Sequence, residues 1–508
     1  MFVLNLFLSS MLLFASALSL SHGRKRGQID SMSPYPTLRW VPCYDSEFTC
    51  TNLRVPLDYN NETAGTTNIA YIKHQSWNPQ AQDIIFHPGG PGVSGVDMLR
   101  NQAFHLSELL GEQYNIISFD PRGVGQSGIT LSCPSSTKNE DASGRNRKLV
   151  RRRNNTSKFE SAKAKAESCS AFNRYTDAKY AGTVANAQDM AHFLDVSGIS
   201  DLWYFGVSYG TALGQTFAAM FPDRVGRMVL DSNVDATEWY TGFMPHIFSS
   251  ADDALEYFFV TCHLIGPICE YFETNQEAMR NRFMELLESL KEKPPTYHGV
   301  EVTDAYTMLI KFLYMSMYSP VKRFPEISRV LISLERGDVE PLLSFDQNWT
   351  GFDPNALDMI MRIDSSVNFP IKTPEQYLAA RQEYERQSQW LGGTLADETL
   401  LGSVGFDLTP PPSQRFPGFN QNGIITKHPI LFVNQLYDAV TSISNAFTVS
   451  KHFPGSRVLA QSSAGHSMAG TPSECTETHV LIYFDQGDLP PPETTCRPDK
   501  VPFFWFEI

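Results

Sequence analysis

The sequence predicts an α/β fold in which a mostly parallel sheet is flanked by helices and interrupted by a helical insertion. Through the first half of the chain, short apolar runs bounded by turn residues alternate with helix-like stretches. This alternation is the pattern of a parallel sheet wrapped by helices. It stops near Thr237 and resumes only after Arg415, and the residues between are typical of helices.

Seven apolar runs are predicted strands, because each is short and lies between turn residues. They are 69–72, 83–86, 115–119, 202–205, 228–230, 429–433 and 457–460. Apolar residues at helical spacing predict an amphipathic helix over 183–196. A further helix should begin after Gly210 and end before Phe221-Pro222, because the residue preceding proline avoids the helical conformation.

The pentapeptide Gly206-Val207-Ser208-Tyr209-Gly210 stands between a predicted strand and a predicted helix. In this context a Gly-x-Ser-x-Gly sequence forms a nucleophile elbow, a sharp turn that lifts the serine hydroxyl clear of a sheet edge. Its glycines are needed because side chains there would collide with neighbouring backbone. A bare pentapeptide of this kind is often only a tight turn, but the flanking strand and helix favour Ser208 as a nucleophile.

Asp438 and His466 each follow one of the last two predicted strands. A serine hydroxyl is a weak nucleophile until a base takes its proton, and the partners of an elbow serine follow in the chain order acid, then histidine. We therefore predict Asp438 as the acid and His466 as the base. Asp231, which ends the strand after the nucleophile helix, is the alternative acid, although loop hydrogen bonding is the role we favour for it.

An oxyanion hole needs two backbone N–H groups directed at the charge that develops during acyl transfer. One is predicted at Tyr209, directly after the nucleophile. The other is predicted at Gly90, in the glycine-rich turn 87–92 that follows a predicted strand. A phosphate-binding loop is the rival interpretation of this turn, but the sequence lacks the lysine and helix of such a loop. No cofactor and no metal ion are expected.

The N-terminus and the cysteines both predict export. Residues 1–20 are largely apolar and uncharged, as in a secretory signal peptide, and a cut is predicted near Ala17. A membrane anchor is the alternative, but small and polar residues interrupt an already short run. Eight cysteines agree with an oxidising compartment. We predict pairing in chain order, because each adjacent pair brackets what looks like one loop: Cys43–Cys50, Cys133–Cys169, Cys262–Cys269 and Cys475–Cys496.

The formal net charge of −14 argues against nucleic acid or an anionic membrane as a partner. It suits solubility in an extracellular medium. Glycosylation acceptors are predicted at Asn61, Asn154, Asn155 and Asn348. The stretch 138–158 is polar and basic, and its composition predicts a surface loop that is open to cleavage or glycosylation.

These observations divide the chain into five parts. They are a signal peptide (1–17), a short N-terminal segment with a candidate processing site after Arg26 (18–35), the first part of the α/β core (36–236), a helical cap (237–415), and the rest of the core with the acid and the base (416–508).

Three sequence blocks together resemble a known family. They are Gly89-Gly90-Pro91-Gly92-Val93-Ser94-Gly95, Asp120-Pro121-Arg122-Gly123-Val124-Gly125-Gln126-Ser127 and Gly206-Val207-Ser208-Tyr209-Gly210-Thr211. The chain resembles α/β-hydrolase serine peptidases of the prolyl and tripeptidyl aminopeptidase type, in particular the secreted fungal and actinobacterial members. The run 429–496, with Asp438 and Gly465-His466-Ser467, looks like the family's terminal region. The resemblance implies the α/β-hydrolase fold and the same roles for Ser208, Asp438, His466, Gly90 and Tyr209.

The resemblance also implies a secreted aminopeptidase that releases single residues or tripeptides from peptides with a free N-terminus. Carboxylate groups must then bind the substrate's α-ammonium group, and Glu238, Asp252, Asp253 and Glu256 are candidates at the entrance of the cap. Plain helix surface is the more common role of acidic residues in such a place, so we do not count them among the predicted site residues. Two departures are His87, where many secreted relatives carry asparagine or another residue, and the basic stretch 138–158, which is longer than the family predicts. A carboxylesterase or lipase-like hydrolase is the alternative within the same fold, and a non-catalytic secreted binding protein is the alternative of another class.

Overall fold

A ten-stranded sheet forms the centre of the molecule, and only one end of it is antiparallel. The computed structural model describes residues 29, 32–44, 47–134, 155–345 and 353–504. The predicted signal peptide, the processing site after Arg26 and the sequons at Asn154 and Asn348 lie outside these residues. The strand order is β1-β2-β3-β5-β4-β6-β7-β10-β11-β12. From β5 to β12 every neighbouring pair is parallel, whereas β1, β2, β3 and β5 pair antiparallel.

All seven predicted strands are present. The strands of the sheet are β1 (Val41–Cys43), β2 (Phe48–Pro56), β3 (Thr66–His74), β4 (Asp83–His87), β5 (Asn115–Phe119), β6 (Leu202–Val207), β7 (Val225–Asp231), β10 (Leu431–Tyr437), β11 (Arg457–Ala464) and β12 (Thr495–Cys496).

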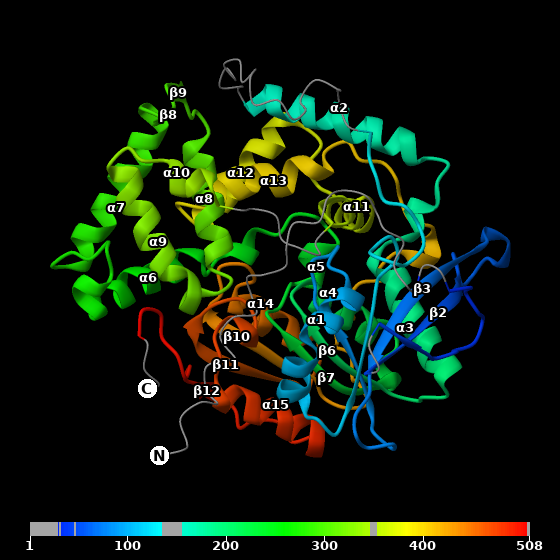
Figure 1. The fold of residues 1–508 in the computed structure, drawn as a ribbon. Helices are drawn as coiled ribbons and strands as arrows, with labels where there is room; N and C mark the ends of the chain where they lie inside the picture. Colours follow the sequence, from blue (N-terminus) through cyan, green and yellow to red (C-terminus); the bar gives the residue numbers. More distant parts are fainter. Residues whose placement is uncertain (1–28, 30–31, 45–46, 135–154, 346–352, 505–508) are drawn as a thin grey trace, which may run out of the picture.

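Helices cover both faces of this sheet (Figure 1). On one face lie α1 (Gly95–Leu110) and α15 (Glu474–Gln486), which pack against Phe205 and Val229. On the other lie α3 (Thr183–Ser197), α4 (Tyr209–Met220) and α14 (Ile443–Val449), which pack against Tyr204 and Met228. Adjacent strand residues thus enter opposite cores, as the two-residue period of a strand requires. The helix α4 ends before Phe221-Pro222 as predicted.

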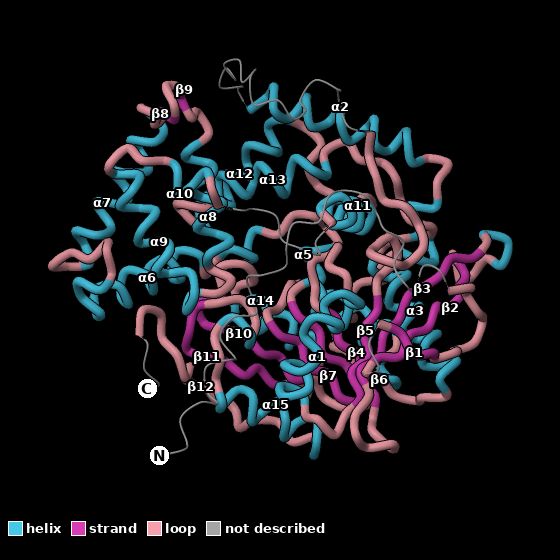
Figure 2. The backbone as a smooth tube through the Cα atoms, in the orientation of Figure 1, coloured by secondary structure: helices cyan, strands magenta, loops and turns pink. Residues whose placement is uncertain are grey.

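A helical layer is inserted between β7 and β10 and has its own apolar core. Figure 2 shows that strand is confined there to the short hairpin of β8 (Thr296–Tyr297) and β9 (Val300–Glu301). The helices are α5 (Ala236–Trp239), α6 (Ala251–Ile265), α7 (Gln276–Glu292), α8 (Ala305–Ser316), α9 (Pro320–Glu335), α10 (Glu340–Leu343), α11 (Pro354–Ser365), α12 (Pro374–Gln387) and α13 (Gly392–Ser403).

The expectation of a surface loop over 138–158 is wrong for its described part. Residues 155–158 begin the helix α2 (Asn155–Asn173), which lies along the inserted helices (Figure 1). Phe159 is buried against Tyr377 of α12, with ring centroids 6.1 Å apart. Lys158 Nζ lies 2.6 Å from Asp397 Oδ2 of α13. Packing against the insertion, rather than the local composition, therefore makes this segment helical.

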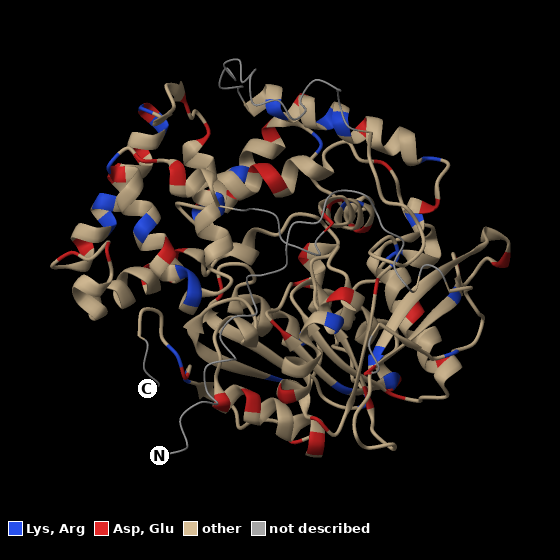
Figure 3. Cartoon of the chain, in the orientation of Figure 1, with Lys and Arg blue, Asp and Glu red and all other residues tan. Residues whose placement is uncertain are grey.

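All four predicted disulfides are confirmed. Cys43–Cys50, Cys133–Cys169, Cys262–Cys269 and Cys475–Cys496 account for every cysteine in the chain. Basic and acidic residues are interspersed over the insertion and the core (Figure 3). Within the described ranges, no helix combines the length and the apolarity needed to cross a bilayer.

Arg122 forms a fully buried ion pair beneath the sheet's edge. Its Nε and Nη2 donate to the two carboxylate oxygens of Asp189 at 2.7 and 2.8 Å. The remaining donors reach the carbonyls of Pro56, Leu57 and Tyr180 at 2.7 to 3.0 Å. A desolvated guanidinium is tolerated only when each donor has a partner. Arg122 therefore joins β2 to α3, and we assign it a structural role.

We expect Arg122→Lys to lower the free energy of unfolding by about 3 kcal/mol, because a lysine cannot replace the bidentate contact or the three carbonyl contacts. Urea denaturation measures this loss. The matched control is Arg386→Lys, whose side chain is 65% exposed and pairs with Glu383, and which should cost less than about 1 kcal/mol. Equal losses in the two variants would contradict the role given to Arg122.

Candidate active site

Ser208 lies on the turn between β6 and α4, at a strained backbone position. Its φ and ψ are 57° and −124°, in a region that residues with a side chain rarely occupy. Its N–H donates to the carbonyl of Asp231 at 2.9 Å. A Cβ on Gly206 would lie 2.6 Å from Gly210 O, and one on Gly210 would lie 2.7 Å from His87 O. The crowding predicted for the nucleophile elbow is therefore present.

Asp438 and His466 meet at the carboxyl ends of β10 and β11. His466 Nδ1 lies 3.0 and 3.2 Å from the two carboxylate oxygens of Asp438. Asp438 is fully buried and accepts hydrogen bonds from the N–H groups of Val440 and Thr441 and from the Thr441 hydroxyl, at 2.8 to 3.0 Å. Because Nδ1 of His466 faces the carboxylate, Nε2 is the ring nitrogen left to accept a proton from another group.

The Nε2 of His466 is buried and makes no hydrogen bond to any described residue. The ring packs against Tyr318 with a centroid distance of 4.9 Å and an interplanar angle of 71°. The N–H of His466 donates to Tyr318 O at 3.2 Å. A residue of the helical insertion therefore holds the imidazole from one side. The unpartnered nitrogen is the atom that would accept the serine proton.

Asp231 and Ser232, at the end of β7, join the serine turn to the histidine loop. The carbonyl of Asp231 accepts the N–H of Ser208, and its Oδ2 accepts the N–H of Met468 at 2.8 Å. Ser232 Oγ accepts the N–H of Ser467 at 2.7 Å. The other carboxylate oxygen of Asp231 is buried and has no hydrogen-bond partner in the described part of the chain. The carboxylate of Asp231 therefore accepts a hydrogen bond from the loop after His466, whereas the carboxylate of Asp438 contacts the His466 imidazole itself.

The glycine-rich turn passes directly over Ser208. A Cβ on Gly89 would lie 2.8 Å from Ser208 Cβ. The N–H of Gly89 donates to His87 Nδ1 at 3.1 Å and is therefore occupied. The next N–H along the turn, that of Gly90, remains our candidate for the oxyanion hole, together with that of Tyr209. Burial alone lowers the pKa of His87 to about 3, and the ring is therefore neutral at any physiological pH.

His87 contacts both the glycine-rich turn and the nucleophile turn, and the sequence marked it only as a departure from its relatives. Because its Nδ1 accepts a hydrogen bond, its proton lies on Nε2, which is buried and lacks a partner among the described residues. Its ring contacts Tyr209 with a centroid distance of 5.8 Å. His87 thus touches both segments that are predicted to form the oxyanion hole.

The four candidate carboxylates for the substrate's ammonium group have different partners. Glu256 is paired with Arg280, and Asp252 accepts hydrogen bonds from Ser388 Oγ and Gln389 N at 2.6 and 3.2 Å. Asp253 is exposed. Glu238 is paired with His246 through one oxygen, while its Oε2 is buried and unpartnered within the described ranges. Burial raises the pKa of Glu238, so a cation near Oε2 would be favourable.

One group of potential metal ligands is found among the described residues, but two of its three members form a disulfide. Cys475, His479 and Cys496 lie together, but the two cysteines form a disulfide. A disulfide sulfur is not the thiolate that binds zinc.

Two family models match the chain. Residues 84–257 match the alpha/beta hydrolase fold, and residues 409–496 match a family described as TAP-like protein. Together with the parallel sheet and its flanking helices, the first match confirms the predicted α/β-hydrolase fold. A solved α/β-hydrolase enzyme, MGS-M2 from a Medee basin deep-sea metagenome library, has a TM-score of 0.38 and 13% identity, covering 85% of this chain and 98% of its own.

Several curated relatives cover most of the chain. "Serine protease Hip1" of Mycobacterium tuberculosis is 23% identical over 90% of this chain and 91% of its own. "Tripeptidyl aminopeptidase" of Streptomyces lividans is 24% identical over 89% of this chain and 84% of its own. "Carboxylesterase B" of Mycobacterium tuberculosis is 24% identical over 88% and 86%. The chain is thus related to serine peptidases and to an esterase.

We expect Asp231→Asn to change the pH dependence of stability. Burial raises the pKa of Asp231 to about 7, and the hydrogen bond from Met468 N–H and the nearby His466 oppose that rise. Between about pH 4 and pH 7 the folded protein holds a proton that the unfolded chain has lost, so the wild type loses stability as the pH rises through this window. The variant should therefore gain up to about 4 kcal/mol on the wild type between pH 4 and pH 8.

Urea unfolding of both proteins at several pH values measures this difference. The asparagine oxygen can still accept the N–H of Met468, so the loop contact is retained. Parallel stability curves for the two proteins would show that Asp231 does not titrate as its burial implies.

Proposed function

We propose that this chain, an enzyme with the α/β-hydrolase fold, is a secreted serine aminopeptidase that acts through Ser208, His466 and Asp438. The observation that carries the proposal is the state of the His466 imidazole. One of its nitrogens is held by a buried carboxylate, and the other is buried and unpartnered. A strained serine turn is tied to the same loop through Asp231. The names of the peptidase relatives support peptides as substrates.

The proposed reaction is acyl transfer in two steps. Nε2 of His466 takes the Ser208 proton while Oγ attacks the scissile carbonyl carbon. The N–H groups of Gly90 and Tyr209 stabilise the oxyanion of the tetrahedral intermediate. The imidazolium, balanced by Asp438, then gives its proton to the leaving amine, and the C–N bond breaks. Water, deprotonated by the same imidazole, releases the acyl group and restores the serine.

Glu238 is our proposed anchor for the substrate's α-ammonium group. Its neighbour Trp239 packs against Tyr209 with a centroid distance of 5.1 Å, which places α5 one side chain from the nucleophile turn. Farther along, Ile247 O accepts the N–H of Ser442 at 3.0 Å, on the loop that follows the acid. The segment therefore borders both sides of the proposed triad. A bound ammonium group would supply the missing partner of the Glu238 carboxylate.

Secretion belongs to the same proposal. Four disulfides support an oxidising compartment. Asn61, in one of the sequons, is exposed and open to glycosylation.

A carboxylesterase is the second candidate, favoured by the relative of that name. The same nucleophile and base can cleave esters, and an esterase needs no anchor for an ammonium group. Substrates with and without a free N-terminus therefore distinguish the two functions.

Ser208→Ala should reduce hydrolysis by roughly 10⁴-fold or more, because the covalent pathway is lost. A fluorophosphonate probe should label the wild type at residue 208 and fail to label the variant. Ser344→Ala, an exposed position of the insertion, is the control and should keep full labelling and activity. Undiminished hydrolysis by Ser208→Ala would contradict the assignment of the nucleophile.

Glu238→Gln should lower kcat/KM for peptides with a free N-terminus by roughly 10- to 100-fold, as expected for a lost charge-assisted hydrogen bond. Its effect on short acyl esters should be small. Glu256→Gln is the matched control, because the Glu256 carboxylate is already taken by Arg280. Peptides acetylated at the N-terminus and cleaved as fast as free ones would favour the esterase.

A further inference from the structure

The N-terminal end of helix α11, which belongs to the insertion, contacts the glycine-rich turn. The N–H of Asp353, the residue that caps α11, donates to Gly92 O at 3.0 Å. A Cβ on Gly92 would lie 2.5 Å from Asp353 O and 3.1 Å from Leu357 N. The helix start is therefore pressed against the turn that carries Gly90.

The other end of α11 reaches the nucleophile turn through Asp364. The N–H and the hydroxyl of Thr183 donate to the two oxygens of Asp364 at 2.8 and 2.5 Å, and Trp239 Nε1 donates at 2.9 Å. Thr183 Oγ1 also lies 2.7 Å from the Tyr209 hydroxyl. Since the threonine proton is given to the carboxylate, the tyrosine must be the donor in that contact. A directed chain therefore runs from Tyr209 through Thr183 to Asp364.

The side chain of Tyr209 is buried and contacts three neighbouring side chains. It is 1% exposed, its ring packs against Trp239 and His87, and its hydroxyl is held by Thr183. Tyr209 is also the first residue of α4 and carries the N–H proposed for the oxyanion hole. The orientation of that N–H depends on where the side chain is fixed, because backbone and side chain share one Cα.

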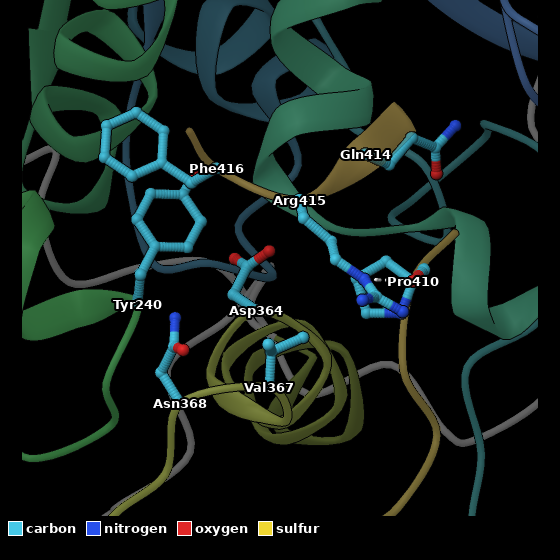
Figure 4. Close-up of a pocket in the computed structure, with 8 residues that line it drawn as sticks. All are labelled: Tyr240, Asp364, Val367, Asn368, Pro410, Gln414, Arg415 and Phe416. Carbon is cyan, nitrogen blue, oxygen red and sulfur yellow. Dashed lines mark hydrogen bonds between the residues drawn. The ribbon is translucent and has the colours of Figure 1, made fainter. Parts of the chain in front are cut away.

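The Asp364 carboxylate is buried, and burial disfavours its ionised form. It faces a pocket of about 230 Å³ between α11 and residues 410–416, bordered by Tyr240 and Arg415 (Figure 4). Burial raises its pKa to about 6, and the hydrogen bonds from Thr183 and Trp239 oppose that rise. The three donors thus hold a desolvated carboxylate in one fixed position.

We propose that Asp364 is a positioning residue through which the insertion aligns the oxyanion hole. Together with the contact between Asp353 and Gly92, it lets one helix hold both segments that supply the oxyanion N–H groups. The inference rests on the proposed function. It assigns the insertion a part in the chemical step in addition to any part in choosing the substrate.

The test compares Asp364→Asn, Tyr209→Phe and the double variant, with kcat and KM for a short acyl ester and the rate of fluorophosphonate labelling as readouts. The N–H and the hydroxyl of Thr183 donate to different oxygens of Asp364, so the amide NH2 group of Asp364→Asn must face one of these donors. Tyr209→Phe removes the hydroxyl at the other end of the same chain of hydrogen bonds. We expect each single variant to lower kcat and the labelling rate by roughly 10- to 100-fold, less than the full loss of an oxyanion donor. KM should stay within about twofold, and the double variant should match the singles rather than multiply them.

Two further variants serve as a negative control and as a substitute for Asp364→Asn. Asp358→Asn changes the same residue type on the same helix, but its partner is the nearby Arg362 and its side chain is 48% exposed, so kcat should be unchanged. Thr183→Val removes the bridging hydroxyl and keeps Asp364, and it should reproduce the loss in kcat if Asp364→Asn does not fold.

Wild-type kcat in a folded Asp364→Asn or Thr183→Val would overturn the inference, and so would losses that multiply in the double variant. A lowered melting temperature with unchanged kcat would show a merely structural role and would overturn it as well. A wild type that is never labelled at Ser208 would instead overturn the proposed function, and this inference with it.

Discussion

The hydrogen bonds made by Asp231 and Ser232 fix the two halves of the candidate site to each other. One backbone carbonyl holds the nucleophile turn, and one carboxylate and one hydroxyl hold the loop after the histidine. Ser208, Ser232 and Ser467 all have positive φ angles, between 57° and 69°. Residues in this region persist only where the surroundings determine them. The junction of β7 therefore sets the geometry of the site before any substrate arrives.

Buried carboxyl groups stand directly after β5, at the end of β7 and near the end of α11, and they share one role. Burial raises the pKa of Asp120 and Asp231 to about 7 and that of Asp364 to about 6. Each accepts hydrogen bonds from backbone N–H groups of a neighbouring loop or helix. Desolvating these groups lowers the stability of the fold. In return, each loop at the edge of the sheet has a fixed position, as a preorganised site requires.

Local patterns in the sequence were sufficient for much of the core. The strand before Gly206, the end of α4 before Pro222 and the disulfides all follow from short-range periodicity, proline chemistry and cysteine order. The strands β1 and β2 were not predicted, since they form through pairing, β1 with β2 and β2 with β3, rather than through their own pattern. The helix α2 was missed because contacts with α12 and α13 outweigh its polar composition.

The residues that position the site were the least predictable. Thr183 lies on α3, Tyr318 between α8 and α9, and Asp364 on α11. No spacing in the sequence relates them to Ser208 or His466. Their contacts join the core to the insertion, Thr183 to Asp364 and His466 to Tyr318. His87 was noted in the sequence only because it is an unusual residue before Pro88. Sequence patterns thus proposed the reacting groups, whereas the contacts around them needed coordinates.

The most direct measurement is a crystal structure of the enzyme after reaction with a fluorophosphonate. The account predicts phosphorus bonded to Ser208 Oγ, a phosphonyl oxygen within hydrogen-bond distance of the N–H groups of Gly90 and Tyr209, and His466 Nε2 turned toward the serine oxygen. A label on another residue, or an imidazole that stays out of reach of residue 208, would contradict it.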